Sequence, residues 1–185
     1  AAVLVKENFK LRSLMKYILS SQTFQLSSQT TPTNAADNQA FSHFPVRRLP
    51  APVMLDAVSQ VTDVPELFAG HPAGTRAIQL WDNRLPSYFL DTFGRSLRES
   101  PCDCGSSGEP TMAQALHLLN APEIERKVQN PAGTAARLAA SDLSTDQIIQ
   151  EIVLMTTGRA PRQKEWQIAR RLMQQGRQRG SEDVL

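Results

Sequence analysis

Apolar residues in this chain recur at helical spacing in several short segments, and this periodicity limits the folds that the chain can adopt. Near its start, one apolar stripe falls at the i, i+3, i+4, i+7 and i+8 offsets that share one face of a helix: Leu11, Leu14, Met15, Ile18 and Leu19. We find no alternation of strand and helix patterns and no internal repeat. The sequence therefore predicts a mainly α fold, an irregular multi-helix domain with long loops.

Changes in composition mark the ends of the predicted helices. The first helix covers about residues 9–21, and residues 22–40 follow as a long polar surface loop rich in Ser, Thr, Asn and Gln. The apolar start at Ala1 lacks an initiator Met, so we expect a fragment, the C-terminal part of a larger protein. We predict a single helical domain over residues 1–173 and a polar, frayed tail over residues 174–185.

Further helices are predicted by their start and stop signals. Proline at positions 50 and 52 opens one helix, and residues 78–81 form a short strand or turn before a short helix within 86–93. Residues 95–110 are a loop by composition, and another short helix runs through residues 124–128. The last helix runs from about residue 161 to a glycine stop at position 176.

Two capping boxes, in which a hydroxyl and an amide side chain satisfy the first N–H groups of a helix, mark two helix starts. Thr111 pairs with Gln114, and Ser144 pairs with Gln147. In the helix that begins at Thr111 we expect four residues to face the core: Met112, Ala115, Leu116 and Leu119.

Charge and composition exclude several classes of protein. The 185 residues include 20 Lys and Arg against 18 Asp and Glu, a net charge of +2, with 41% hydrophobic and 21% charged residues. These values exclude a collagen, a coiled-coil rod and a wholly disordered chain. No apolar run reaches the roughly 18–20 residues of a membrane span. The basic C-terminal region favours a solvated face or an acidic partner domain over nucleic acid, which would require a basic stripe with stacking aromatic residues.

Local motifs for common chemistries are absent from the sequence. It contains no G-x-G-x-x-G, no Walker-type loop, no H-E-x-x-H and no G-x-S-x-G. It also contains no C-x-x-C-H, so we expect no cofactor, and no covalently attached c-type haem, in this chain. Whether the chain is an enzyme stays open at this stage.

The two cysteines, Cys102 and Cys104, are the most suggestive pair for redox or metal chemistry. Thiols one residue apart in a loop rich in Gly and Pro can bind a metal together or alternate between dithiol and disulfide. His117 is a further candidate for such a site, but the spacing matches no known zinc motif, so no metal site is assigned. A structural or simply oxidised pair is favoured over a redox pair, and a redox pair over a metal site.

Other polar and aromatic residues are candidates for a ligand site or an interface. Guanidinium groups bind anions through two hydrogen bonds, and an indole ring stacks on sugars. The candidates are the arginines and the tryptophan, with two acidic residues beside them: Arg47, Arg48, Trp81, Asp82, Arg84 and Glu109. The alternative is structural, with the arginines paired to carbonyls or to Asp56 and with Trp81 in the core, and we favour it. For His117, which lies between two leucines, a satisfied and partly buried side chain is favoured over a ligand or a base.

Several motifs occur together in an order that identifies a family resemblance. They are Gln25-Leu26-Ser27-Ser28, Phe41-Ser42-His43-Phe44, Arg47-Arg48-Leu49-Pro50, Leu55-Asp56-Ala57, Phe89-Leu90-Asp91-Thr92-Phe93-Gly94-Arg95, Cys102-Asp103-Cys104 and the segment from Glu109 to Asn120. With these motifs the chain resembles domain of unknown function family 1553 over about residues 9–173.

The resemblance implies a biological context and no reaction. Members of the family are typical of planctomycete-type bacteria and are usually large exported proteins, which implies a periplasmic or cell-envelope location. In them this domain follows a second uncharacterised domain and often a c-type cytochrome domain. An upstream domain of the same protein is therefore the expected partner, and any haem c lies elsewhere in the parent protein.

Three hypotheses about function follow from the residues together with what the resemblance implies. The preferred one is an accessory or interaction module of a larger exported bacterial protein linked to a c-type cytochrome system. The alternative is part of an extracytoplasmic enzyme or redox protein that acts on polysaccharide, with the two cysteines as a redox or metal site. A third is a carbohydrate-binding surface built on Trp81 and Arg84.

Overall fold

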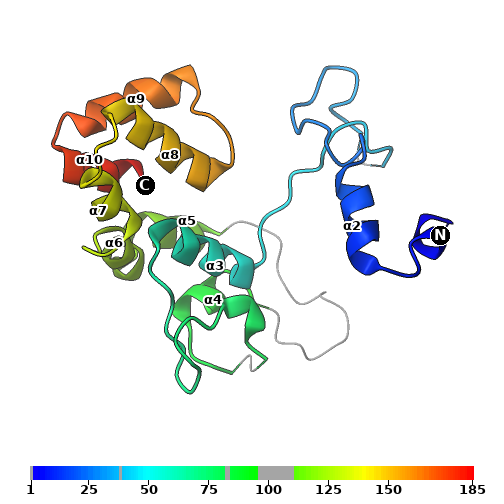
Figure 1. Ribbon diagram of the computed structural model, residues 1–185, viewed down its shortest axis with the longest axis horizontal. Helices are drawn as coiled ribbons and strands as arrows, with labels where there is room; N and C mark the ends of the chain where they lie inside the picture. Colours follow the sequence, from blue (N-terminus) through cyan, green and yellow to red (C-terminus); the bar gives the residue numbers. More distant parts are fainter. Residues whose placement is uncertain (1, 38, 82–83, 96–110) are drawn as a thin grey trace. The chain divides into compact units, whose positions relative to one another are not determined.

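A computed structural model describes residues 2–37, 39–81, 84–95 and 111–185 (Figure 1). Within these ranges the regular elements are helices and no strand occurs, so the prediction of a mainly α fold is confirmed. No described helix is both long enough and apolar enough to cross a membrane. The chain divides into two units, Ala1–Arg48 and Leu49–Leu185, and each is described by itself below. The single domain predicted over residues 1–173 stays a prediction.

The first unit contains two short helices, α1 (Ala2–Lys6) and α2 (Leu11–Leu19), followed by irregular chain. Asn8 and Phe9, with φ of 49° and 58°, turn the backbone between the helices. The predicted polar loop contains no helix or strand in the described part of residues 22–40. None of the unit's described residues is buried, so these residues have no core of their own.

The Asp37 carboxylate organises a tight turn in that loop. It accepts hydrogen bonds from the backbone N–H groups of Gln39 (3.0 Å), Ala40 (2.7 Å) and Ser42 (2.9 Å), and from the Ser42 hydroxyl. The Ser42 hydroxyl and these N–H groups hold the pKa of Asp37 well below its usual range.

In the second unit, one core lies between helices that come from distant parts of the chain. Its buried residues are Ala51, Leu55, Ala77, Leu80, Phe89 and Leu90. The elements around it are α3 (Ala51–Thr62), the 3-10 turn η1 (Ala77–Gln79), α4 (Tyr88–Thr92), α5 (Met112–Asn120) and α6 (Pro122–Val128).

The Asp56 carboxylate fixes η1 against α3. It accepts hydrogen bonds from the backbone N–H groups of Ala77 (2.6 Å) and Ile78 (3.2 Å), and its second oxygen lies 3.5 Å from Arg76 Nε. Within the second unit, Asp56 therefore forms an ion pair with Arg76. The short strand or turn predicted at residues 78–81 is a helical turn that ends at residue 79.

A second core lies among the C-terminal helices, which Figure 1 shows side by side. Its buried residues are Leu138, Ile148, Ile149, Ile152, Val153, Ala169 and Met173. The helices are α7 (Thr134–Ala139), α8 (Thr145–Thr157), α9 (Gln163–Met173) and α10 (Arg177–Val184). The predicted capping box of α8 is present, because Ser144 Oγ accepts from the Gln147 N–H and Gln147 Oε1 accepts from the Ser144 N–H.

Most of the C-terminal segment, residues 177–184, forms a helix, whereas its polar composition predicted a frayed tail. α10 packs against α7, α8 and α9, with Gly180 and Ser181 buried. Arg177 donates to the carbonyls of Ala139 (2.6 Å), Leu143 (2.6 Å) and Ser141, which lie at and after the end of α7. Composition missed α10 because its buried residues are a glycine and a serine, and Val184 is its one apolar residue against the core.

Candidate functional site

Helix α5 begins at the capping box that the sequence predicts. The Thr111 hydroxyl accepts a hydrogen bond from the Gln114 N–H (3.3 Å), and Gln114 Oε1 accepts one from the Thr111 N–H (3.2 Å). The same Gln114 side chain donates through Nε2 to the Thr92 carbonyl at the end of α4 (3.0 Å). Gln114 is therefore buried and connects α5 to α4.

One turn further along α5, His117 is buried on the same face. Its ring lies among three aromatic rings, with centroid distances of 5.2 Å to Tyr88, 5.5 Å to Phe89 and 5.8 Å to Phe93. His117 Nε2 lies 3.0 Å from Glu123 Oε1 on α6, although the two atoms are not aligned as a hydrogen bond. The sequence favoured a satisfied and partly buried His117; the side chain is buried, whereas its Nε2 has no hydrogen-bond partner in the described part of the chain.

The opposite face of α5 is apolar and exposed. Met112 is 75% exposed, Leu116 52% and Leu119 79%, and Ala115 is also exposed. The prediction that these four residues face the core is wrong. The physical reason lies in the contacts of the polar side chains. Gln114 donates to the Thr92 carbonyl, and His117 packs among aromatic rings beside the Glu123 carboxylate. The polar side of the helix is therefore the side that packs.

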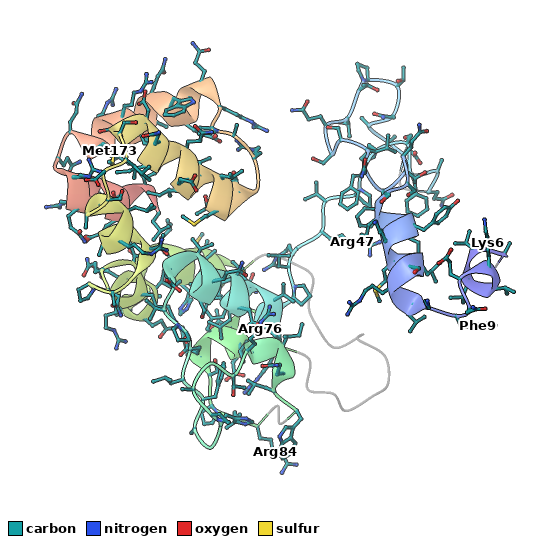
Figure 2. All side chains as sticks on the ribbon, in the orientation of Figure 1. Lys6, Phe9, Arg47, Arg76, Arg84 and Met173 are labelled. Carbon is teal, nitrogen blue, oxygen red and sulfur yellow. The ribbon has the colours of Figure 1, made fainter. Side chains whose placement is uncertain are left out.

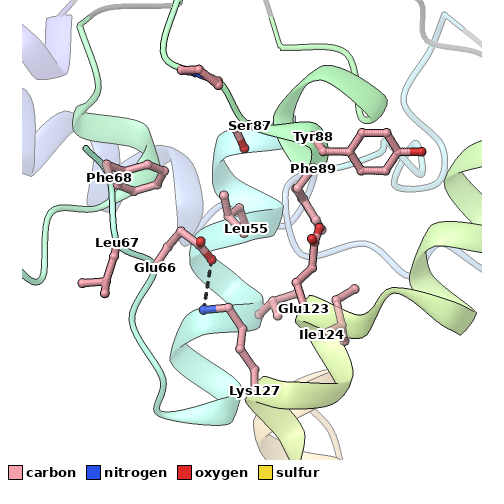
Figure 3. A pocket seen from close by; sticks show the side chains of 12 residues that line it. Leu55, Glu66, Leu67, Phe68, Ser87, Tyr88, Phe89, Glu123, Ile124 and Lys127 are labelled. Atoms are coloured by element: carbon pink, nitrogen blue, oxygen red, sulfur yellow. Dashed lines mark ion pairs between the residues drawn. The ribbon is translucent and has the colours of Figure 1, made fainter. Parts of the chain in front are cut away.

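A pocket of about 130 Å³ lies beside this site, between α3, α4, α6 and the loop that follows α3 (Figure 3). Lys127 is buried at its base. The Lys127 ammonium donates to the Val64 carbonyl (2.7 Å) and to Ser59 Oγ (3.4 Å), and it lies 3.1 Å from Glu66 Oε2. Through these two hydrogen bonds and the ion pair, Lys127 connects α6 to α3 and to the loop that follows α3.

The pocket wall combines apolar side chains with two carboxylates. Figure 3 shows Glu66 and Glu123 on it together with Leu55, Phe68, Tyr88 and Phe89. Because one water occupies about 30 Å³ of liquid, the pocket holds a few waters or one small group of a ligand. Sequence reasoning missed Glu66, Glu123 and Lys127; the i, i+4 spacing of Glu123 and Lys127 on one helix was their only local signal.

The comparison with protein families shows the family of the chain. The model of the family PSD1, described as a protein of unknown function (DUF1553), matches residues 1–173. The chain belongs to the DUF1553 family. No curated protein and no solved structure matches it. The match ends at the last residue of α9, so α10 lies beyond the residues that the DUF1553 model matches.

The other predicted site residues of this DUF1553 chain fall into two groups. Trp81 is 77% exposed rather than in the core, and Arg84, Arg47 and Arg48 are exposed as well; Figure 2 labels Arg47 and Arg84. The remaining candidates lie outside the described residues: Asp82, Cys102, Cys104 and Glu109.

The described part of the chain shows no cluster of metal ligands. There, no group of three or more His, Cys, Asp or Glu side chains comes close enough to hold a metal ion. The hypotheses for the Cys102–Cys104 pair stay predictions.

Proposed function

We propose that this chain is an accessory interaction module, whose α5 face packs on an upstream domain of a larger exported bacterial protein. The single observation that carries the proposal is the orientation of α5, with Gln114 and His117 inside and Met112, Leu116 and Leu119 outside. Exposed apolar side chains in a row mark an interaction surface. The family resemblance supports a periplasmic or cell-envelope location and a link to a c-type cytochrome system.

The composition of the α5 face supports an apolar protein partner over a charged ligand. From Thr111 to Ala121 the sequence holds no Asp, Glu, Lys or Arg, and its one titratable side chain, His117, is buried. Residues 112, 116 and 119 follow the i, i+4, i+7 pattern by which a helix fits a groove or packs on a second helix. Burial of such a row stabilises an interface in proportion to the apolar area removed from water.

The proposal is tested by adding the rest of the parent polypeptide to this chain in trans and measuring the affinity by calorimetry. The Leu119→Ser and Leu116→Ser variants should each bind about tenfold more weakly or worse, as expected for apolar residues at the centre of an interface. The matched control is Ile168→Ser, which removes an exposed apolar side chain from α9 and should bind as the unmodified chain does. Equal binding by all variants, or turnover of a substrate by the chain alone, would contradict the accessory role.

A carbohydrate-binding surface is a second candidate function, and the exposure of Trp81 favours it. An exposed indole ring provides the flat apolar face on which a sugar ring stacks, and Arg84 is three residues away in the sequence. Glycans should then change the tryptophan fluorescence of the chain. The change should be lost in Trp81→Ala and retained in Trp166→Phe, which alters the only other tryptophan. No response to any polysaccharide would remove this candidate.

A further inference from the structure

Helix α2 presents a second apolar face, separate from that of α5. Leu11, Met15 and Ile18 follow the i, i+4, i+7 spacing, and Leu19 extends the stripe; all four side chains are exposed. The helix is strongly amphipathic in sequence, and none of the described residues of its unit is buried. The described residues of this unit therefore do not cover the apolar face of α2.

The charged residues of α2 and of its N-cap all have one sign. Arg12 and Lys16, one helical turn apart, follow one edge of the stripe, and Lys10 stands at its N-terminal end. Residues 8–36 contain no Asp or Glu. Among the described residues, no carboxylate forms an ion pair with any of these three cations.

From these observations we infer that α2 docks into an apolar protein groove bordered by Asp and Glu side chains. The inference rests on the proposed interaction function and names the chemistry of a partner surface for a different helix. Four apolar anchors over two turns match the helix-in-groove mode of recognition, and the cations complement an acidic rim.

Two other occupants fit the face less well. A second copy of α2 would bring like charges together, which disfavours pairing of the two faces. A lipid surface would accept the cations, but α2 has nine residues and buries little apolar area in a bilayer, and binding to lipid scales with that area.

The test places the photo-crosslinking amino acid p-benzoylphenylalanine at position 15, in the full parent protein in its own cells. Mass spectrometry of the product should map the crosslink to an apolar protein segment flanked by Asp or Glu. The charge-reversed variant Arg12→Glu/Lys16→Glu should lower the crosslink yield about tenfold, and exchange of the mapped carboxylates for Lys should restore it. The same reversal on α9, Lys164→Glu/Arg171→Glu, is the matched control and should leave the yield unchanged.

Several outcomes would overturn the inference. They are a crosslink to lipid, to a second copy of this chain or within the same chain, a mapped surface without carboxylates, no crosslink at all, or a yield that charge reversal does not change. Circular dichroism of the charge-reversed chain checks that α2 still folds. Loss of binding in Leu119→Ser together with an unchanged position-15 crosslink in the charge-reversed protein would reject the α2 groove while the α5 interface stands.

Discussion

At the residue scale, buried polar side chains of the second unit connect helices to one another and to loops. The buried Lys127 ammonium connects α6 to Ser59 on α3 and to the loop carbonyl of Val64, with Glu66 3.1 Å away. Glu66 keeps about a third of its side chain exposed, whereas Lys127 keeps a tenth. The two partners of this ion pair therefore contribute unequally to stability.

We expect Lys127→Met to lower the free energy of unfolding by about 1–3 kcal/mol, because the Val64 carbonyl loses the charged donor that now binds it at 2.7 Å. Glu66→Gln should cost less than about 1 kcal/mol, since water replaces the lost contact at the exposed carboxylate. Urea denaturation of both variants measures the difference. A larger effect for Glu66→Gln than for Lys127→Met would contradict this account.

Glu165 is expected to give part of the stability a dependence on pH. The Arg159 guanidinium, with help from the Arg162 N–H, lowers the pKa of Glu165 to about 2 from its usual value of 4.5. A lowered pKa means that the folded state binds the proton more weakly than the unfolded state. The stabilisation is therefore complete above about pH 5 and is lost as the pH falls toward 2.

The Glu165→Gln variant should consequently show a smaller fall in denaturation midpoint between pH 5 and pH 2 than the unmodified chain. Gln keeps an oxygen that accepts from the Arg162 N–H, so the start of α9 retains its cap. Denaturant titrations at several pH values check the result. Parallel pH profiles for the two proteins would refute the assigned role.

At the element scale, α10 shows how a glycine permits close packing of helices. A Cβ at Gly180 would lie 2.5 Å from Met173 Cα and 2.9 Å from Met173 Sδ, so α9 would have to shift. Met173, labelled in Figure 2, belongs to the core that α10 covers. Most glycines in helices weaken the helix relative to alanine, whereas this one is required by its neighbour.

Gly180→Ala should therefore destabilise the chain by about 1–3 kcal/mol, the usual cost of an overpacked contact. Arg179→Ala, at the exposed neighbouring position of the same helix, is the control and should change stability by less than about 0.5 kcal/mol. Thermal denaturation of both variants provides the comparison. If Gly180→Ala proved more stable than the unmodified chain, α10 would not pack as described.

At the scale of the whole molecule, the periodicity of the sequence predicted the helical class, and the hydroxyl–amide pairs correctly located the starts of α5 and α8. These signals are local, so they need no knowledge of neighbours. The orientation of α5 could not be predicted in this way, because the carbonyl of Thr92 and the rings of Tyr88 and Phe89 that contact Gln114 and His117 come from α4. The same reason explains why the Lys127–Glu66 pair, 61 positions apart, was missed.

We propose above that the apolar face of α5, which is exposed among the described residues, is covered in the parent protein. The direct test is the rate of methionine oxidation by peroxide, followed by peptide mass spectrometry. Met112 is 75% exposed and Met173, which serves as the internal standard, is 8% exposed. In the chain alone Met112 should oxidise much faster than Met173, and in the full parent protein its rate should fall toward that of Met173. Slow oxidation of Met112 in the chain alone, or an unchanged fast rate in the parent, would contradict the account.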